Sequence, residues 1–166
     1  SLPIHIELFD LLGFRRPKYG HNCSLQKIDG ETRRKLSKRK DPEAAVSYYH
    51  SAGYPTESVM EYLTTISNSN FEDWRRANKT EPLSKFPFNL KKMSISGALI
   101  DLDKMTDVSK TVISGFDAQT VYERLISWAE KYDKDYFELL TRDPDFTKGL
   151  FSIDRGGKKP RKDIAK

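Results

Sequence analysis

Hydrophobic residues recur at three- and four-residue spacing along most of this chain, which is the period of an amphipathic helix. From residue 41 onward the pattern predicts a series of helices, one of them carrying Val59, Met60, Leu63 and Ile66 on one face. Thr56 stands where it can cap that helix, which we expect to pack as a hairpin with the helix before it. The spacing therefore predicts a mainly α fold.

Residues that begin and end helices support this prediction. Asp41 is placed to cap the first helix of the series, with Pro42 at the first helical position and Gly53 at the end. Asp101 and Asp117 are placed to cap two longer helices further along. Three shorter helices are expected over 71–77, around 136–140 and from about residue 144.

The first 40 residues follow a different pattern. Apolar positions share one helical face over 3–12, ahead of Gly13, and predict a short helix packed on a sheet. A strand is expected over 22–28, and Asp29-Gly30 is typical of a hairpin turn, after which a second extended piece enters a basic loop. We therefore expect a short helix and a small β element before a multi-helix region.

The basic loop over 33–40 holds the run Lys35-Leu36-Ser37-Lys38-Arg39, and no acidic residue lies within it. Two ammonium groups, a hydroxyl and a guanidinium in a flexible loop can close several charge-assisted hydrogen bonds around a polyphosphate. The alternative is a solvated basic loop or a nonspecific polyanion patch, which composition alone favours.

The run resembles the Lys-Met-Ser-Lys-Ser motif of class I aminoacyl-tRNA synthetases, in the Lys-Leu-Ser-Lys-Arg form typical of glutamyl-tRNA synthetases. Ala52-Gly53-Tyr54 and Phe88-Asn89-Leu90 are similar to later segments of that family. The resemblance implies an excised piece of a longer enzyme, in three parts. These are the end of the catalytic domain with its loop (1–40), a helical stem-contact region (41–114) and a helical region leading to the anticodon-binding part (115–166), with a basic tail at 155–166.

The resemblance also implies a function, that of a glutamate-tRNA ligase, which activates glutamate with ATP and transfers it to tRNA. Lys38 is then the strongest ATP contact, assisted by Lys35 as the second catalytic residue, while Ser37 and Arg39 also bind ATP. ATP and Mg²⁺ would serve the full-length enzyme, with neither expected tightly bound here. The family's His-x-Gly-His-like motif is not found, so we expect this piece alone to be inactive. A glutaminyl-tRNA ligase piece and a noncatalytic RNA-binding module remain alternatives.

Charge is distributed unevenly, with a net +6 over 1–40, −6 over 41–154 and +5 over 155–166. Phosphate contacts with tRNA must therefore come from local patches rather than from a uniformly basic domain. Trp128 and Tyr132 lie at helical spacing, and we interpret them as packing residues rather than as a base-stacking surface. The predicted tRNA contacts are Arg75, Arg76, Lys79, Lys91, Lys92, Lys158, Lys159 and Arg161.

The remaining composition narrows the class of protein. Cys23 is the one cysteine in the sequence, which excludes an internal disulfide framework, and no Cys/His cluster has the spacing of a zinc site. No apolar run approaches membrane-spanning length. We therefore expect a cytoplasmic monomer that binds no metal through its own side chains and no membrane, with tRNA, glutamate and ATP as the partners of the complete enzyme.

Overall fold

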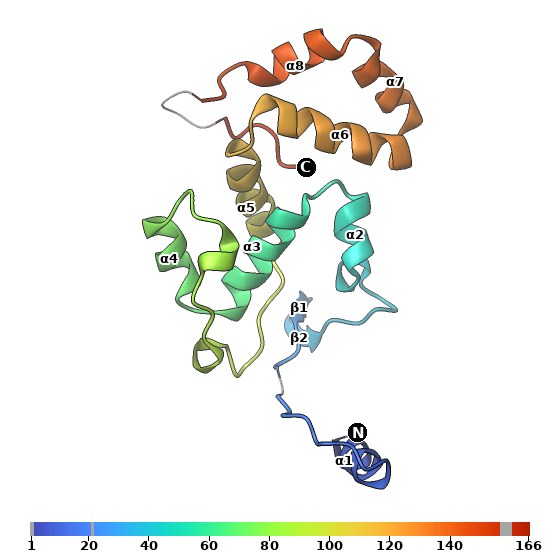
Figure 1. Cartoon of the computed structure of the whole chain (residues 1–166), viewed down its shortest axis with the longest axis vertical. Helices are drawn as coiled ribbons and strands as arrows, with labels where there is room; N and C mark the ends of the chain where they lie inside the picture. The colour runs from blue at the N-terminus through green and yellow to red at the C-terminus, as the bar shows by residue number, and fades with distance from the viewer. Residues whose placement is uncertain (1, 21, 157–160) are drawn as a thin grey trace.

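The structure, a computed structural model, describes residues 2–20, 22–156 and 161–166 (Figure 1). The described part is mainly helical, which confirms the predicted fold class. Its elements are α1 (Leu2–Leu11), β1 (Gln26–Asp29), β2 (Thr32–Lys35), the 3₁₀ turn η1 (Pro42–Ala44), α2 (Val46–Ser51), α3 (Thr56–Ser67), α4 (Phe71–Ala77), η2 (Leu83–Lys85), η3 (Leu90–Lys92), α5 (Leu102–Ser114), α6 (Ala118–Tyr132), α7 (Lys134–Arg142) and α8 (Pro144–Ser152).

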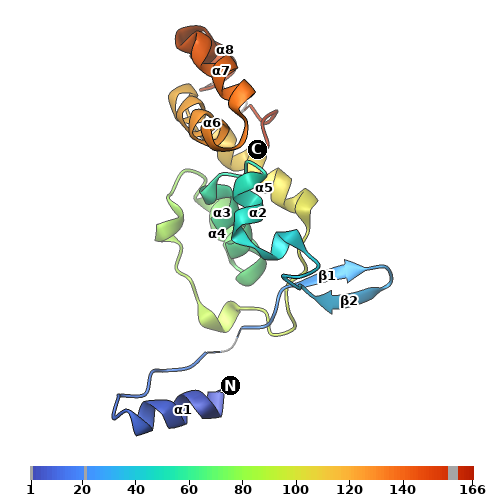
Figure 2. The same ribbon diagram turned by 90° about the vertical axis from the view of Figure 1, so that its right-hand side faces the viewer.

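Helix α1 forms where the pattern predicts it and is followed by Gly13 at a φ of 69°, a conformation that suits a glycine after a helix. The expectation that it packs on a sheet is wrong. None of its residues is buried, and it lies apart from the helical body, the part formed by α2 to α5, in both views (Figures 1 and 2). In the described residues the sheet consists of the β1–β2 hairpin, which lies away from α1, so its apolar face has no sheet to cover it.

The two strands form an antiparallel hairpin that turns at Gly30, whose φ is 61°. The strand expected from residue 22 begins only at Gln26. Its outer edge is tied to the segment before α5, because the Gln26 amide donates to the Ala98 carbonyl and the Ile100 amide donates to the Gln26 carbonyl, each at 2.8 Å. The hairpin is therefore fixed to the helical body at its base and projects from it at its turn (Figure 2).

The core of the helical body lies where α3 packs along α5. It consists of the buried side chains Tyr49, Tyr54, Val59, Tyr62 and Met105. The expected α2–α3 hairpin is wrong in its main contact, because α3 packs chiefly on α5 while α2 contributes Tyr49. Helix α2 has only 6 residues, since the chain after Pro42 first makes a 3₁₀ turn, and it is too short to cover α3.

The side chains that cap the first turns of α5 and α6 are those that the local sequence predicts, whereas the cap predicted for α3 is not formed. The Asp101 carboxylate accepts hydrogen bonds from the first amides of α5, and the Asp117 carboxylate accepts one from the Thr120 amide at 2.7 Å, as predicted. The cap expected at Thr56 is wrong, because α3 already begins there and Pro55, which has no side-chain donor or acceptor, occupies the N-cap. The two aspartates therefore determine where α5 and α6 begin.

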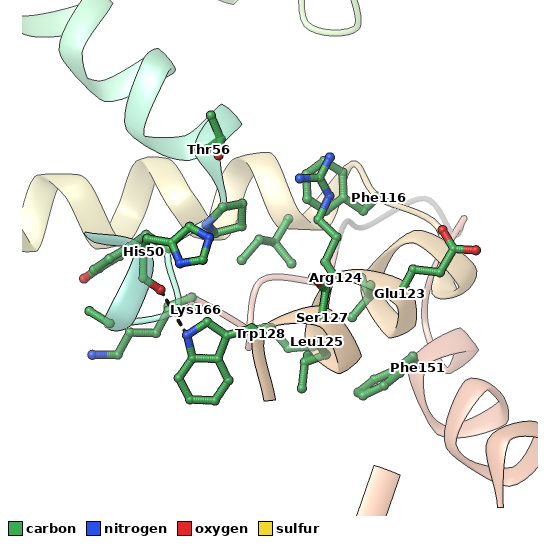
Figure 3. A pocket seen from close by; sticks show the side chains of 18 of the residues that line it. His50, Thr56, Phe116, Glu123, Arg124, Leu125, Ser127, Trp128, Phe151 and Lys166 are labelled. Atoms are coloured by element: carbon green, nitrogen blue, oxygen red, sulfur yellow. Dashed lines mark hydrogen bonds between the residues drawn. The ribbon is translucent and has the colours of Figure 1, made fainter. Parts of the chain in front are cut away.

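Helices α6, α7 and α8 pack on one another as a second helical unit. Its junction with helix α2 includes the Trp128 indole, which donates to the His50 carbonyl at 3.0 Å (Figure 3). At the same junction the Tyr132 hydroxyl lies 3.0 Å from His50 Nδ1. Trp128 is half-buried and Tyr132 is 38% exposed, so both pack at this junction as interpreted, Tyr132 at its edge. A cavity of about 960 Å³ lies here, and Lys166 of the final segment is among its lining residues.

Candidate functional site

The predicted phosphate-binding residues lie together on one short loop. Lys35 is the last residue of β2, Ser37 lies two positions further on, and 38–40 form a turn that leads into η1. The side chains of Lys35, Lys38 and Arg39 are exposed, whereas Ser37 is half-buried. The structure thus brings the four residues together, with three cations facing solvent and the hydroxyl nearer the body.

Asp41 anchors this loop from inside, with a side chain only 1% exposed. Its two carboxylate oxygens accept hydrogen bonds from both terminal nitrogens of the Arg34 guanidinium, at 2.6 and 2.7 Å. The Ser37 backbone amide also donates to Asp41 Oδ2, at 2.8 Å. A bidentate guanidinium pair is among the strongest and most directional polar contacts in proteins, so the base of the loop is held firmly.

Two further carboxylates complete the network. The Lys27 ammonium lies 2.5 Å from Glu43 Oε1 and 3.4 Å from Asp41 Oδ1, and Arg34 Nε donates to Asp29 at 2.5 Å. The hydrogen bonds from Arg34, followed by that from the Ser37 amide, hold the pKa of Asp41 well below its usual value. The contact with Lys27 likewise lowers the pKa of Glu43. The hydrogen bond from Arg34 also lowers the pKa of Asp29, so all three carboxylates are negatively charged, and they share the two cations Lys27 and Arg34.

The ion pairs among the described residues leave the loop's own cations free. Lys35, Lys38 and Arg39 take part in none of them, whereas Arg34 and Lys27 are engaged. An exposed loop in which the 35–39 run carries three cations outside these ion pairs, attached at its base, can close around a ligand that presents several anionic oxygens.

The prediction that Asp41 caps the following helix is wrong. Asp41 does precede the 3₁₀ turn η1, but its side chain makes no capping hydrogen bond there. It faces back toward the loop because the Arg34 guanidinium and the Ser37 amide offer stronger partners than the first amides of a three-residue turn.

The sequence reasoning missed Lys27, Arg34, Asp41 and Glu43 as parts of this site. A signal was present in the hairpin register, which places Lys27 directly across from Arg34. Two cations in opposite positions repel each other unless a carboxylate comes between them. Asp41, the first acidic residue after the basic run, was the available candidate.

The predicted tRNA contacts that the structure describes divide into two groups. Arg76, Lys79, Lys91 and Lys92 are exposed. The Lys92 carbonyl accepts from the Ser69 amide at 3.2 Å, so η3 lies against the turn between α3 and α4. These four residues are therefore available to a ligand in solution.

Arg75 and Arg161 are engaged within the fold. Arg75 forms an ion pair with Glu61 and donates to the carbonyls of Asn78 and Glu81, at 2.9 and 2.6 Å. It also stacks over Trp74, with the guanidinium carbon 4.9 Å from the ring centroid. These contacts use the guanidinium of Arg75 to hold α4 and the loop after it against α3.

Arg161 donates to the Leu150 and Ile153 carbonyls at 3.1 and 2.9 Å and pairs with Asp163. It thereby holds the final segment to the end of α8. The predicted contacts Lys158 and Lys159 lie outside the described residues.

The described part of the chain contains no group of three or more His, Cys, Asp or Glu side chains arranged to hold a metal ion. None of its helices combines the length and the apolar character needed to cross a bilayer.

An exposed basic loop that joins a small hairpin to a helical region is the arrangement implied by the class I aminoacyl-tRNA synthetase resemblance. Comparison with curated proteins gives the particular relatives. The chain is 51% identical over all of its 166 residues to the glutamate–tRNA ligase of Clostridium perfringens (strain 13 / Type A). It is 51% identical over 164 residues to that of Acetivibrio thermocellus, and 46% identical over 178 aligned positions to that of Sorangium cellulosum, with 99% of the chain covered in each case.

The chain spans about 30% of the length of these relatives. No family model matches it. The comparisons confirm the resemblance: over its whole length the chain is related to one segment of the glutamate–tRNA ligases.

Proposed function

We propose that this chain is part of a glutamate–tRNA ligase, in which it supplies a loop for the phosphates of ATP and helices that contact tRNA. The observation that carries the proposal is the exposed loop with Lys35, Lys38 and Arg39 unpaired among the described residues. It occurs in a chain about half identical to ligases of that name, which favours glutamate over the glutaminyl alternative. A cytoplasmic monomer belongs to the same proposal.

The reaction proposed for the longer enzyme explains why such a loop is useful. A carboxylate oxygen of glutamate attacks the α-phosphorus of ATP, and the bond to the β-phosphate oxygen breaks, releasing pyrophosphate. Negative charge then accumulates on the leaving group. Lys38 and Lys35, with the Ser37 hydroxyl and Arg39, would donate to those oxygens more strongly in the transition state than in the ground state.

The described residues near the loop do not suit a resident Mg²⁺ ion. The nearby carboxylates of Asp41, Glu43 and Asp29 already face Arg34 or Lys27, and a hard cation needs oxygen ligands that are free to coordinate it. We therefore assign no metal ligand to this chain.

Replacing Lys38 tests the role of the loop. Lys38→Ala in the longer ligase should raise the barrier to adenylate formation by roughly 2 to 4 kcal/mol, as for loss of one oriented charged donor. Lys40→Ala is the matched control, since Lys40 is also exposed but lies outside the Lys35–Arg39 run, and it should retain the native rate. Unchanged single-turnover rates for Lys38→Ala would exclude the assigned role. The chain by itself should show no pyrophosphate exchange.

Salt dependence tests the proposed tRNA contacts. Replacing Lys91 and Lys92 together by alanine should reduce the slope of log K against log salt by about 1 for each tRNA phosphate that is no longer neutralised. Tight binding by the native chain that does not change with salt would contradict contacts of this kind. Arg75 and Arg161 are left out of the proposed set because the fold uses their guanidinium groups.

A further inference from the structure

We propose that Asp41 is a positioning residue for the phosphate loop. Its buried carboxylate fixes the backbone of Ser37 and draws Arg34 inward, so that Lys38 meets the phosphate from one defined place. The inference rests on the proposed function, because it explains how the same loop acts rather than assigning a second site.

Backbone and side-chain contacts of Asp41 close the loop into a small ring. The Asp41 carboxylate accepts from the Ser37 amide at 2.8 Å, while the Asp41 amide donates to the Ser37 carbonyl, also at 2.8 Å. The Lys40 amide donates to the same carbonyl at 3.0 Å. Ser37 is thus held at both its amide and its carbonyl, and Lys38 and Arg39 stand at the tip of the ring.

The ring is also fixed to the elements on either side of it. Before the loop, the Leu36 amide donates to the Leu25 carbonyl at 2.9 Å, which fixes the chain leaving β2 to the residue just before β1. After the loop, the Glu43 carbonyl accepts from the Tyr49 hydroxyl at 2.9 Å, which fixes η1 to the helical core. Asp41 lies along the chain between these two attachments. Because its carboxylate binds Arg34 of β2, it links the hairpin to the helical core.

Removing Asp41 would have two opposing effects on phosphate binding. It would release Arg34 and remove a negative charge, which increases the general attraction for anions. It would also free the Ser37 backbone and so reduce the share of loop conformations in which Lys38 reaches the ligand. Total affinity cannot separate the two effects, but the contribution of Lys38 in each background can.

The experiment is a double-mutant cycle on this chain with inorganic tripolyphosphate as the probe, measured by calorimetry. Lys38→Ala should weaken binding about tenfold in the native background, the scale of one hydrogen bond to a charged group. In the Asp41→Asn background the same change should weaken binding by less than roughly threefold, because the two positions are coupled. Asparagine keeps the size of Asp41 and one acceptor oxygen, so this variant retains the shape of the site.

A second measurement follows the anchor itself. Hydrogen exchange of the Ser37 amide should be slow in the native chain, faster in Asp41→Asn and fastest in Asp41→Ala, with helical circular dichroism unchanged in Asp41→Asn. The matched control is Glu43→Gln, which removes the negative charge facing Lys27 at a residue that forms no ion pair with the 35–39 run among the described residues. It should leave both the Ser37 exchange rate and the Lys38 contribution at native values.

Each other outcome has a defined meaning. If Lys38→Ala costs the same factor in the native and Asp41→Asn backgrounds, the positioning role is wrong while the phosphate loop stands. If Glu43→Gln reduces the Lys38 contribution as much as Asp41→Asn does, the effect belongs to the whole ionic network and not to Asp41. If Lys38→Ala changes nothing in the native chain, the phosphate role itself fails and the inference fails with it.

Discussion

The loop region and the helical body of this protein are held together by different forces. At the base of the loop, the Asp41 carboxylate, which is 1% exposed, makes its bonds with a guanidinium and a backbone amide. In the body, Tyr62 and Met105 are 1% and 0% exposed and lie among other apolar side chains. Apolar packing is strong but non-directional, whereas charged hydrogen bonds fix geometry. The difference indicates that the body supplies stability and the ionic network supplies orientation.

The largest expected effect comes from the body. Met105→Ala removes a fully buried side chain at the α3–α5 contact and should lower the free energy of unfolding by about 2 to 5 kcal/mol. Urea unfolding followed by circular dichroism measures the change. Ile95→Ala is the control, because that side chain is 96% exposed and its removal should leave stability unchanged. A Met105 variant as stable as the native chain would show that the described core is not the main source of stability.

A smaller effect is expected where a charged group serves the body instead of the loop. Arg75→Ala should destabilise the chain by roughly 1.5 to 3 kcal/mol, since it removes the ion pair with Glu61 and two bonds to carbonyls. Arg76→Ala, at a position 72% exposed, should change stability by no more than about 0.5 kcal/mol. Equal stability of the two variants would argue against the engaged position of Arg75 and return it to the candidates for tRNA contact.

The sharpest separation of the two regions is expected from changes in pH. The pKa of Asp41 is lowered from 3.8 by its contacts with Arg34 and Ser37, so their stabilisation is complete above that value. It is lost as the pH falls through the lower folded pKa. Burial raises the pKa of Tyr49 from 10.0 to about 12, so the body loses stability as the pH rises between those values.

Amide NMR signals test both halves of this prediction. As the pH falls well below about 4, through the lowered pKa of Asp41, the Ser37 amide should respond before those of α3 and α5, and alkali above about pH 10 should do the reverse. Asp41→Asn should remove the acid response at Ser37 and leave the alkaline response unchanged. Simultaneous loss of all signals at both extremes would mean that the two regions unfold as one unit.

Much of the helical region could be predicted because its signals are local. The periodic apolar positions of α3 and α5 and the caps Asp101 and Asp117 depend on neighbours within a few residues. The errors lie where partners outside an element compete with those that its own periodicity or caps predict. Asp41 has the sequence of a helix cap but forms its bonds with Arg34, and α3 packs on α5, more than 30 residues away in sequence, instead of on its neighbour.

The candidate site shows the same division. The run from Lys35 to Arg39 could be recognised because residue types in a fixed order carry its chemistry. The sequence likewise determined the helical periodicity and the uneven distribution of charge. Only the tertiary structure decided which cations are free and which are engaged, because pairing depends on distances between side chains separated along the chain. Arg34 and Arg39 are the same residue type in one basic run, yet one binds Asp41 and the other faces solvent.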